Sequence, residues 1–417
     1  MITATQTHPE DGEGRDVTKF SVVIPYKQRL HNLRLALESL ARQSLPSDEF
    51  EVLLGAMEYD PAYVSMCAEF NGRLDITSVL SAREWQTAYA RNMALRQAVG
   101  EVVILLDADM VVPTRFLENL YRQHFASGQN VCVVGQMLDY DNNTSDVLTV
   151  EAKPFEHYAG LLEGLEAAGE VREDPRLAVE HVIPWSFAWT ALIALPNETI
   201  RRHGLLFDVA FRGYGVEDLE WAYRVSACGT PISMAADVYG IHLPHTRDLA
   251  ANQRSEVLNY RHFLRTWPEP DVELACAFGD FEANALARGL RGEVSAIFGP
   301  DRQPAVVRGT VDGLSTLVVG AAVDSALKPA DPDLRALFQD EPQVLPLVGL
   351  ALPVADGEID QCFILEPVAR FSDRYRERIL GEGRRASTKV RVLSADEPIR
   401  PALPDNSPSA AATPGAV

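Results

Sequence analysis

The chain has 417 residues and a formal net charge of −21, from 38 Lys and Arg against 59 Asp and Glu. This acidic balance disfavours a nucleic-acid partner and docking on an anionic membrane, because both require a basic surface. The length allows two domains of ordinary size, or one large domain with an extension.

Cysteine usage and the N-terminus indicate where the protein works. The five cysteines are scattered and form no Cys-X-X-Cys pair, so a disulfide framework or a cysteine zinc site is not expected. The first residues are polar and acidic, without the apolar core of a signal peptide. No apolar run reaches the roughly 18 residues that a membrane span needs. We therefore expect a soluble, cytoplasmic protein.

The first half of the chain alternates between strand-like and helix-like segments. Apolar runs predict strands at residues 21–26, 51–57, 73–80, 102–106 and 130–138. Amphipathic stretches predict helices between the first two strands and at residues 84–98. This order predicts an α/β fold, with a mostly parallel central sheet and helices on both faces.

The pattern changes after about residue 245. Residues 247–290 predict helices with Leu258, Phe263 and Leu264 as apolar anchors. Residues 303–366 carry β-like runs, namely AVVRGTV, STLVVGAAV, VLPLVGLALPV and CFILEPV. The expected domains are a main domain at 19–247, a helical extension at 248–295 and a C-terminal α/β accessory domain at 296–394. Polar residues 1–18 and the Pro-, Ala- and Ser-rich residues 395–417 are expected to be disordered tails.

The accessory region shows no motif that carries chemistry. We expect it to recognise an acceptor or to mediate self-association, for instance as a homodimer.

The most informative stretch is EVVILLDADMVVP, residues 101–113. Its apolar run predicts a strand buried on both faces that ends in Asp107-Ala108-Asp109. Ligands of open α/β folds bind at the carboxyl ends of such strands. Two carboxylates there can hold a hard divalent cation and bring it to a diphosphate. The alternative is an ordinary polar strand end that caps the next helix.

A second candidate motif is GYGVED, residues 213–218. Its glycines allow positive φ and a close approach of the backbone to a ligand. Glu217 and Asp218 then begin a helix whose buried face would carry Leu219, Ala222 and Val225. The alternative assigns both carboxylates to a helix start, where the helix dipole favours them. That position is also expected to lower the pKa of Asp218.

Four elements occur in a fixed order along the chain. They are SVVIPYKQRLHNLRLALESLARQS, ARNMAL, LLDAD, and FRGYGVEDLEWAYR followed by His242 and His245. Together they resemble inverting glycosyltransferases of family two with the GT-A fold, over about residues 19–247. The last element is similar to a motif shared by galactosyltransferases and N-acetylgalactosaminyltransferases.

The resemblance implies a function and a set of roles. It implies transfer of a sugar from a nucleoside-diphosphate sugar, most often a UDP-sugar, to an acceptor hydroxyl with inversion and with Mn or Mg. Asp109 would be the direct metal ligand, with Asp107 contacting ribose or reaching the metal through water. The third ligand would be His242, with His245 as the alternative.

The same resemblance assigns the acid–base groups. Asp218 matches the general base, and Glu217 matches the neighbouring acid that binds the acceptor. Gly215 would border the sugar or acceptor pocket. Relatives often have Gly-Gly upstream of the base motif, whereas this chain has Phe187-Ala188-Trp189-Thr190, and Trp189 would stack on a sugar or acceptor ring. Trp189 is equally expected in the core, the commoner fate of a tryptophan in an apolar run.

Other donor-site residues are matched less closely. Pro25, Tyr26 and Ala108 would border the nucleotide. Relatives end the second strand in an acidic DDGS-like sequence, whereas Glu58 and Asp60 are only approximate matches here. The base is therefore open between uridine, thymidine and guanosine. Arg91 would approach the diphosphate or lie as a cation on a helix surface.

Two other classes of protein share parts of this pattern. A nucleotidyltransferase that makes nucleotide sugars would need a glycine-rich phosphate loop after the first strand, but PYKQRLHN has no glycine. A non-catalytic sugar- or nucleotide-binding module would not need its acidic and histidine residues. Because no membrane segment is visible, the expected acceptor is soluble: a peptide, a small natural product or an oligosaccharide.

Overall fold

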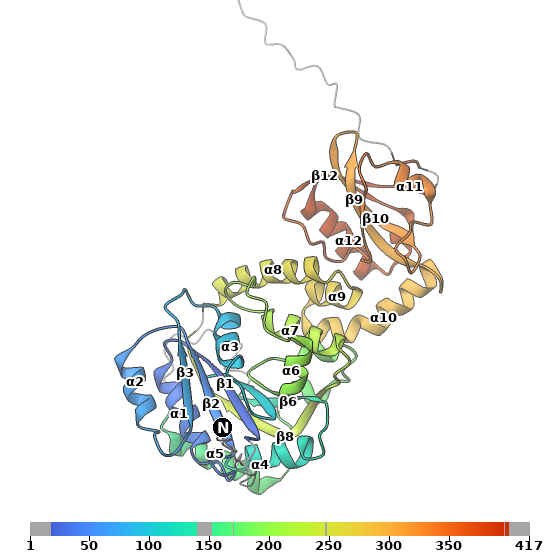
Figure 1. The fold of residues 1–417 in the computed structure, drawn as a ribbon. Coiled ribbons are helices and arrows are strands. Elements are labelled where there is room, and N and C mark those ends of the chain that lie inside the picture. Colours follow the sequence, from blue (N-terminus) through green and yellow to red (C-terminus); the bar gives the residue numbers. More distant parts are fainter. Residues whose placement is uncertain (1–17, 140–151, 170, 247, 396, 400–417) are drawn as a thin grey trace, which may run out of the picture. The chain divides into compact units, whose positions relative to one another are not determined.

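The computed structural model describes residues 18–139, 152–169, 171–246, 248–395 and 397–399 (Figure 1). The two predicted tails lie almost entirely outside these residues. The chain folds as two compact units, Met1–His262 and Phe263–Val417. All five cysteines are free thiols. Within the described residues, no helix is both long and apolar enough to cross a bilayer.

An eight-stranded mixed sheet organises the first unit, in the order β3-β2-β1-β4-β7-β6-β8-β5. Its strands are β1 (Phe20–Tyr26), β2 (Phe50–Ala56), β3 (Ile76–Leu80), β4 (Val102–Leu106), β5 (Met110–Val111), β6 (Cys132–Leu138), β7 (Leu192–Pro196) and β8 (Ile232–His242). The four strands from β3 to β4 are parallel, which confirms the expected α/β class. The sequence did not predict β5 and β7, which run antiparallel to their neighbours.

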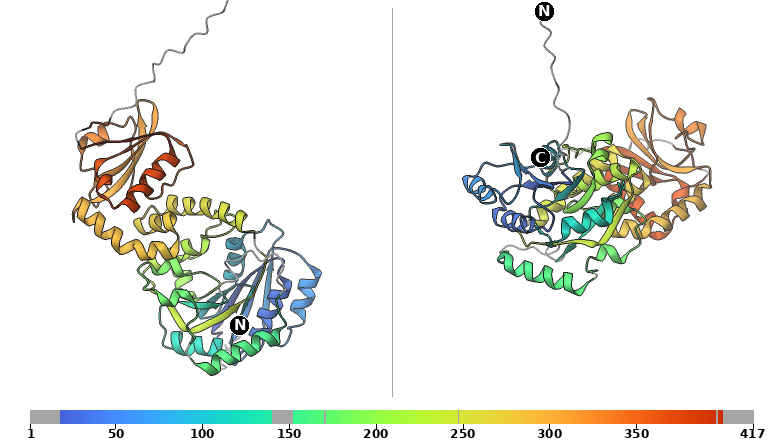
Figure 2. Two further views of the ribbon diagram at one scale, coloured as in Figure 1. Left: turned by 180° about the vertical axis from the view of Figure 1, so that it is seen from behind. Right: turned by 60° about the horizontal axis from the view of Figure 1, so that its bottom comes forward.

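Helices cover both faces of this sheet (Figures 1 and 2). The helices of this unit are α1 (Leu30–Leu40), α2 (Pro61–Ala68), α3 (Thr87–Leu95), α4 (Phe116–Leu120), α5 (Phe155–Ala168), α6 (Asn197–His203) and α7 (Glu217–Ala227), followed by α8 (Leu249–Thr266), which lies away from the sheet faces and begins in this unit. Right-handed crossovers place α1 and α2 on the face opposite α3, because the strand order reverses after β3. Every residue of β1 and β4 is consequently buried.

The carboxyl ends of β1, β4 and β8 meet at one edge of the sheet. Strand β8 is parallel to β6, and β6 and β4 are both antiparallel to β7. These strands therefore run in the same direction. The residues that follow them, including Arg29, Asp107 and Asp109, lie at the same edge as His242.

In its described residues, the second unit combines four complete helices with a five-stranded sheet in the order β11-β9-β10-β12-β13. Its elements are α9 (Pro270–Phe278), α10 (Asp280–Phe298), β9 (Gln303–Val311), β10 (Leu314–Val323), α11 (Pro332–Ala336), β11 (Gln343–Leu345), β12 (Ile359–Ile364), α12 (Asp373–Ala386) and β13 (Ser387–Val392). Phe263 and Leu264 are buried as expected, but Leu258 is 63% exposed and is not an anchor.

Only Gln343–Leu345 of the run around VLPLVGLALPV forms a strand. The reason is a buried acid on α9. The Glu273 carboxylate accepts the backbone N–H groups of Val348, Gly349 and Leu350, each at 2.7 Å. These groups are therefore satisfied without a neighbouring strand. These bonds join α9 to the segment after β11, and both belong to the second compact unit, which begins at Phe263.

Removal of the Glu273 side chain is expected to destabilise the protein strongly. Glu273→Ala would leave three buried N–H groups without an acceptor, at a cost of about 1–3 kcal/mol each. Thermal unfolding of the full chain should show a clearly lower midpoint, and Glu273→Gln, which keeps one acceptor oxygen, should lie between. An unchanged midpoint for Glu273→Ala would show that these bonds contribute nothing net.

Candidate active site

The acidic pair sits in a tight connection between β4 and β5. The N–H of Met110 donates to the carbonyl of Asp107 at 3.1 Å. Met110 then pairs with His242 across the β5–β8 ladder, and the N–H of Leu243 donates to the carbonyl of Asp109 at 2.7 Å. This antiparallel pairing, which the sequence did not reveal, is what brings the end of β8 to the acidic pair.

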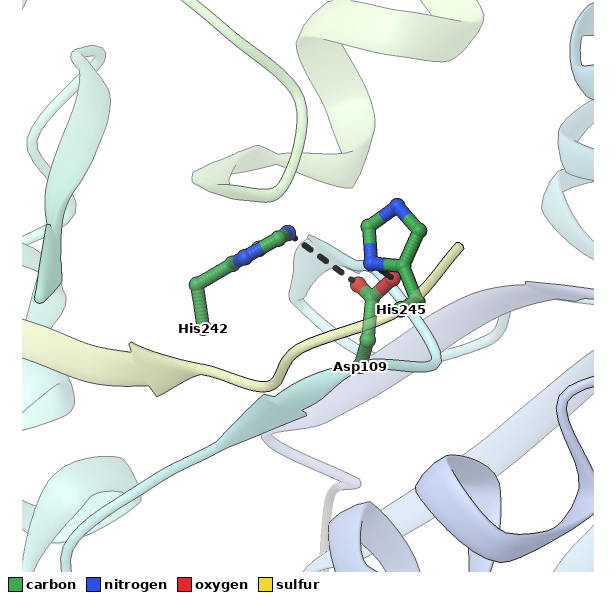
Figure 3. Close-up of side chains that lie close together, drawn as sticks. All are labelled: Asp109, His242 and His245. Atoms are coloured by element: carbon green, nitrogen blue, oxygen red, sulfur yellow. Dashed lines mark ion pairs between the residues drawn. The ribbon is translucent and has the colours of Figure 1, made fainter. Parts of the chain in front are cut away.

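Asp109, His242 and His245 form a group whose ligand atoms all lie within 4.8 Å of one another (Figure 3). His242 Nε2 is 3.7 Å from Asp109 Oδ1, and His245 Nδ1 is 3.2 Å from Asp109 Oδ2. One carboxylate and two imidazoles are a donor set that can hold a divalent transition metal. The sequence singled out His242 and kept His245 as the alternative, whereas the structure brings both rings to Asp109.

Arg29 also contacts this group, and sequence reasoning missed it. Its Nη1 donates to Asp109 Oδ2 at 2.5 Å. Asp109 is 2% exposed, while the Arg29 side chain is 44% exposed. A buried carboxylate needs a counter-charge, and Arg29 provides one from the solvent side. Its position just after β1, at the shared edge of the sheet, is the signal that could have identified it.

Arg91 links the acidic pair to the GYGVED motif. Its Nη2 donates to Asp107 Oδ1 and its Nη1 to Glu217 Oε1, both at 3.0 Å. With a side chain only 4% exposed, Arg91 is not a cation on a helix surface. Asp107 is held by this guanidinium and lies outside the Asp109–histidine group, so the two acids of the pair have different surroundings.

The backbone before α7 adopts left-handed conformations at three positions. Gly213, Gly215 and Val216 have φ values of 71°, 90° and 73°. A β-branched residue such as Val216 rarely adopts positive φ, and such strain persists only where surrounding contacts hold it. This segment delivers Glu217 and Asp218 to the first turn of α7.

The pKa of Asp218 moves opposite to the direction expected from its position. Burial and, after it, the neighbouring charge of Glu217 together raise the pKa of Asp218 to about 7, although Arg91 opposes both. The expectation that the helix start lowers this pKa was therefore wrong, because desolvation outweighs the helix dipole. A carboxyl group with a pKa near neutrality is suited to accept a proton.

Several residues expected at the donor site are buried in the fold. Pro25 and Tyr26 lie within β1, and the Tyr26 ring stacks on Tyr63 with a centroid distance of 4.7 Å. Ala108 is 7% exposed between the two acids. The structure does not bring the Tyr26 ring to the Asp109 group, so its expected contact with a nucleotide base stays a prediction.

The two acids after β2 make local contacts. Glu58 accepts the backbone N–H of Gln28 at 2.6 Å, which ties the ends of β1 and β2 together. Asp60 caps α2 by accepting the N–H of Ala62 at 2.9 Å. Glu58 thus remains at the carboxyl edge of the sheet, whereas Asp60 has a helix-capping role.

Trp189 is partly buried and packs against the main hydrophobic core. The guanidinium carbon of Arg176 lies 4.4 Å from its ring centroid. Arg176 is fully buried and ion-paired with Asp174. These contacts agree with the core alternative for Trp189, and stacking on a sugar stays a prediction.

Comparisons with known proteins find similar glycosyltransferases. Residues 21–171 match the model of glycosyl transferase family 2. The chain is 29% identical over 307 residues to a validoxylamine A glucosyltransferase from Streptomyces hygroscopicus subsp. limoneus, covering 68% of both chains. It is 22% identical over 260 residues to the uncharacterized glycosyltransferase YfnE of Bacillus subtilis, covering 54% of this chain and 65% of that protein.

A solved structure is also similar. The mannosyltransferase of Pyrobaculum calidifontis in complex with GDP-Man and Mn2+ is 19% identical with a TM-score of 0.43, and the match covers 66% of this chain and 76% of that one.

The mixed sheet places this unit in the α/β class, and the acids and histidines at its carboxyl edge agree with a transferase that acts on a nucleotide sugar. Residues 21–171 match glycosyl transferase family 2, and together with the similarity to known glycosyltransferases this match identifies the protein as a glycosyltransferase.

The raised pKa of Asp218 predicts a pH-dependent stability. The folded protein holds this proton more tightly than the unfolded chain between about pH 4 and pH 7. Unfolding in that window therefore releases a proton, and the free energy of unfolding from this group falls as pH rises through it. When metal ions have been removed with a chelator, the melting temperature should decline less between pH 4.5 and pH 8 for Asp218→Asn than for the wild type. Parallel curves would contradict the raised pKa.

Proposed function

We propose that this protein transfers a sugar from a UDP-sugar to an acceptor hydroxyl by direct displacement with inversion. The observation that carries the proposal is the Asp107–Arg91–Glu217 linkage. It ties an acid at the metal-capable edge to the loop that presents Asp218. The Asp109–histidine group, suited to bind a diphosphate through a cation, therefore belongs to the same site as Asp218, which is suited to accept a proton.

Asp109, His242 and His245 would hold the metal ion, with Asp107 beside them. Their mixed oxygen and imidazole donors fit Mn or Mg. Arg29 would serve the diphosphate rather than the metal, because its side chain is 44% exposed and would turn from Asp109 towards a bound phosphate. When bound, the ion supplies Lewis-acid stabilisation of charge on the diphosphate.

Asp218 would act as the general base. As the acceptor oxygen attacks the anomeric carbon, its proton passes to the Asp218 carboxylate. The bond between that carbon and the diphosphate oxygen breaks, and the electron pair leaves with the nucleoside diphosphate. A single attack opposite the leaving group inverts the configuration. Glu217, held by Arg91, would bind the acceptor hydroxyl.

The relatives supply the first substrates to test. The name of the Streptomyces relative leads us to propose a glucosyl donor and a soluble small-molecule acceptor. The decisive experiment incubates the full chain with Mn and UDP-glucose, with and without validoxylamine A, and measures UDP release. GDP-mannose and UDP-N-acetylglucosamine serve as donor controls. Transfer product with inverted configuration supports the proposal.

The same assay separates the alternatives. A non-catalytic binding module would bind UDP with Mn but release no UDP from any donor. A nucleotidyltransferase would instead release pyrophosphate from a nucleoside triphosphate and a sugar phosphate.

Asp109→Ala is expected to abolish the stabilisation of the protein by UDP with Mn. Ligand binding raises the melting temperature by mass action, and Asp109 is the acid shared by both histidines. His242→Ala and His245→Ala, measured in the same way, show which ring contributes. The metal assignment is wrong if Asp109→Ala retains the full Mn-dependent shift.

Asp218→Asn is expected to slow donor turnover by about a hundred- to ten-thousand-fold, the usual effect of losing a general base. Its affinity for UDP with Mn should change little, because the metal-capable group lies on other residues. Glu217→Gln should chiefly raise KM for the acceptor. If Glu217→Gln loses turnover and Asp218→Asn keeps it, the two roles are exchanged.

A further inference from the structure

We propose that Asn259, on α8 and outside the family motifs, is a positioning residue for the loop that carries Asp218. The inference rests on the proposed role of Asp218 as base. It assigns a catalytic task to a helix that sequence analysis treated as an extension beyond the main domain.

The segment before α7 is irregular, so its backbone polar groups need partners outside a helix or sheet. Side chains supply them along its whole length. The carbonyl acceptors and their donors are Leu205 with Trp221, Leu206 with Arg224, Phe207 with Asn92, Val209 and Phe211 with Gln86, and Arg212, Tyr214 and Gly215 with Asn259.

Asn259 holds the end of this segment that enters α7. Its Nδ2 donates to the carbonyls of Arg212, Tyr214 and Gly215 at 2.9, 3.2 and 2.9 Å. Its Oδ1 accepts the N–H of Arg212 at 3.3 Å. Asn259 is only 5% exposed, so water cannot readily replace these bonds. The Asn259 amide therefore binds one backbone N–H group and three backbone carbonyls of the loop.

Two further residues on α8 contact the same segment. Ser255 Oγ accepts the N–H of Tyr214 at 3.0 Å, and His262 Nε2 lies 2.8 Å from Asp208 Oδ2. Residues 255, 259 and 262 follow the spacing of one helix face. The approach is close enough that a Cβ at Gly213 would lie 2.7 Å from the Ser255 Cβ. The loop and α8 are therefore fitted to each other.

This contact holds the strained part of the loop. Gly215 accepts from Asn259 and directly precedes Val216, whose φ of 73° is unfavourable for a branched residue. Without the amide, the segment can relax, and Glu217 and Asp218 shift with it. Misplacement of a catalytic group by about 1 Å can cost about a hundredfold in rate. Metal and diphosphate binding lie on the Asp109 side and would be spared.

The test uses the full chain, the UDP-sugar that gives the fastest Mn-dependent hydrolysis in the donor screen, and Asn259→Ala. Expected results are a loss of kcat of about tenfold to a hundredfold, little change in the binding of UDP with Mn, and faster hydrogen exchange at residues 212–216. Asn259→Gln, which keeps the amide, should recover part of the kcat.

Asn197→Ala is the matched control. Asn197 is 6% exposed and its Nδ2 donates to the carbonyls of Ala98 and Gly100 at 3.2 and 2.8 Å, at the opposite edge of the sheet. It should lower the melting temperature without a comparable loss of kcat. If Asn259→Ala does not fold, Ser255→Ala removes the two hydrogen bonds of the Ser255 hydroxyl with the Tyr214 backbone and should show the same pattern with a smaller loss.

The outcomes separate this inference from the proposed function. If Asp218→Asn abolishes hydrolysis but Asn259→Ala loses no more kcat than Asn197→Ala, the positioning role is wrong. If Asp218→Asn retains hydrolysis, the base assignment fails instead. In that case hydrogen exchange alone tests whether Asn259 holds the loop. Unchanged exchange at residues 212–216 in Asn259→Ala would show that it does not.

Discussion

The site depends on the burial of carboxylates at the end of β4 and on the cations that compensate them. Asp109 is almost fully buried and is met by Arg29, His242 and His245. An uncompensated carboxylate in such a place would be strongly destabilising, so the fold must bring positive or protonatable groups to it. The strand order does this, because the carboxyl ends of β1, β4 and β8 converge at one edge. The same arrangement that satisfies Asp109 is a donor set for a metal ion.

The second cation, Arg91, solves a different problem. It is more deeply buried than Arg29, and it divides its hydrogen bonds between Asp107 and Glu217. The Arg29 side chain is 44% exposed and pairs with one acid, whereas the Arg91 side chain is 4% exposed and pairs with two. We therefore regard Arg29 as the exchangeable counter-charge and Arg91 as the permanent one. Arg91 also joins α3, the end of β4 and the start of α7, so the two halves of the site keep a fixed relation.

Sequence reasoning succeeded where one dominant periodicity decides the structure. The run before Asp107 is apolar at every position, and only a strand covered on both faces accommodates it. It failed where a distant side chain decides. The run around Val348 looks like a strand but is irregular, because Glu273 satisfies its N–H groups from α9. Arg29 was overlooked because its role follows from strand order, which no local pattern encodes. The pKa of Asp218 was expected in the wrong direction, because burial is a tertiary property whereas helix position is a local one.

The loop before α7 shows why catalytic segments escape local prediction. A helix or strand would satisfy its own backbone, but its regular geometry would not permit the positive φ values at Gly213, Gly215 and Val216. An irregular loop permits them and leaves its carbonyls to be satisfied by side chains from elsewhere in the chain. Here Gln86 at the start of α3, Asn92 within α3 and Asn259 on α8 supply the amides, from before and after the motif. The motif alone therefore specifies which carboxylates are present, while residues up to His262 specify where they are held. The compact unit ends at that point of α8 rather than at the end of the last strand, which agrees with α8 being part of the machinery of the site.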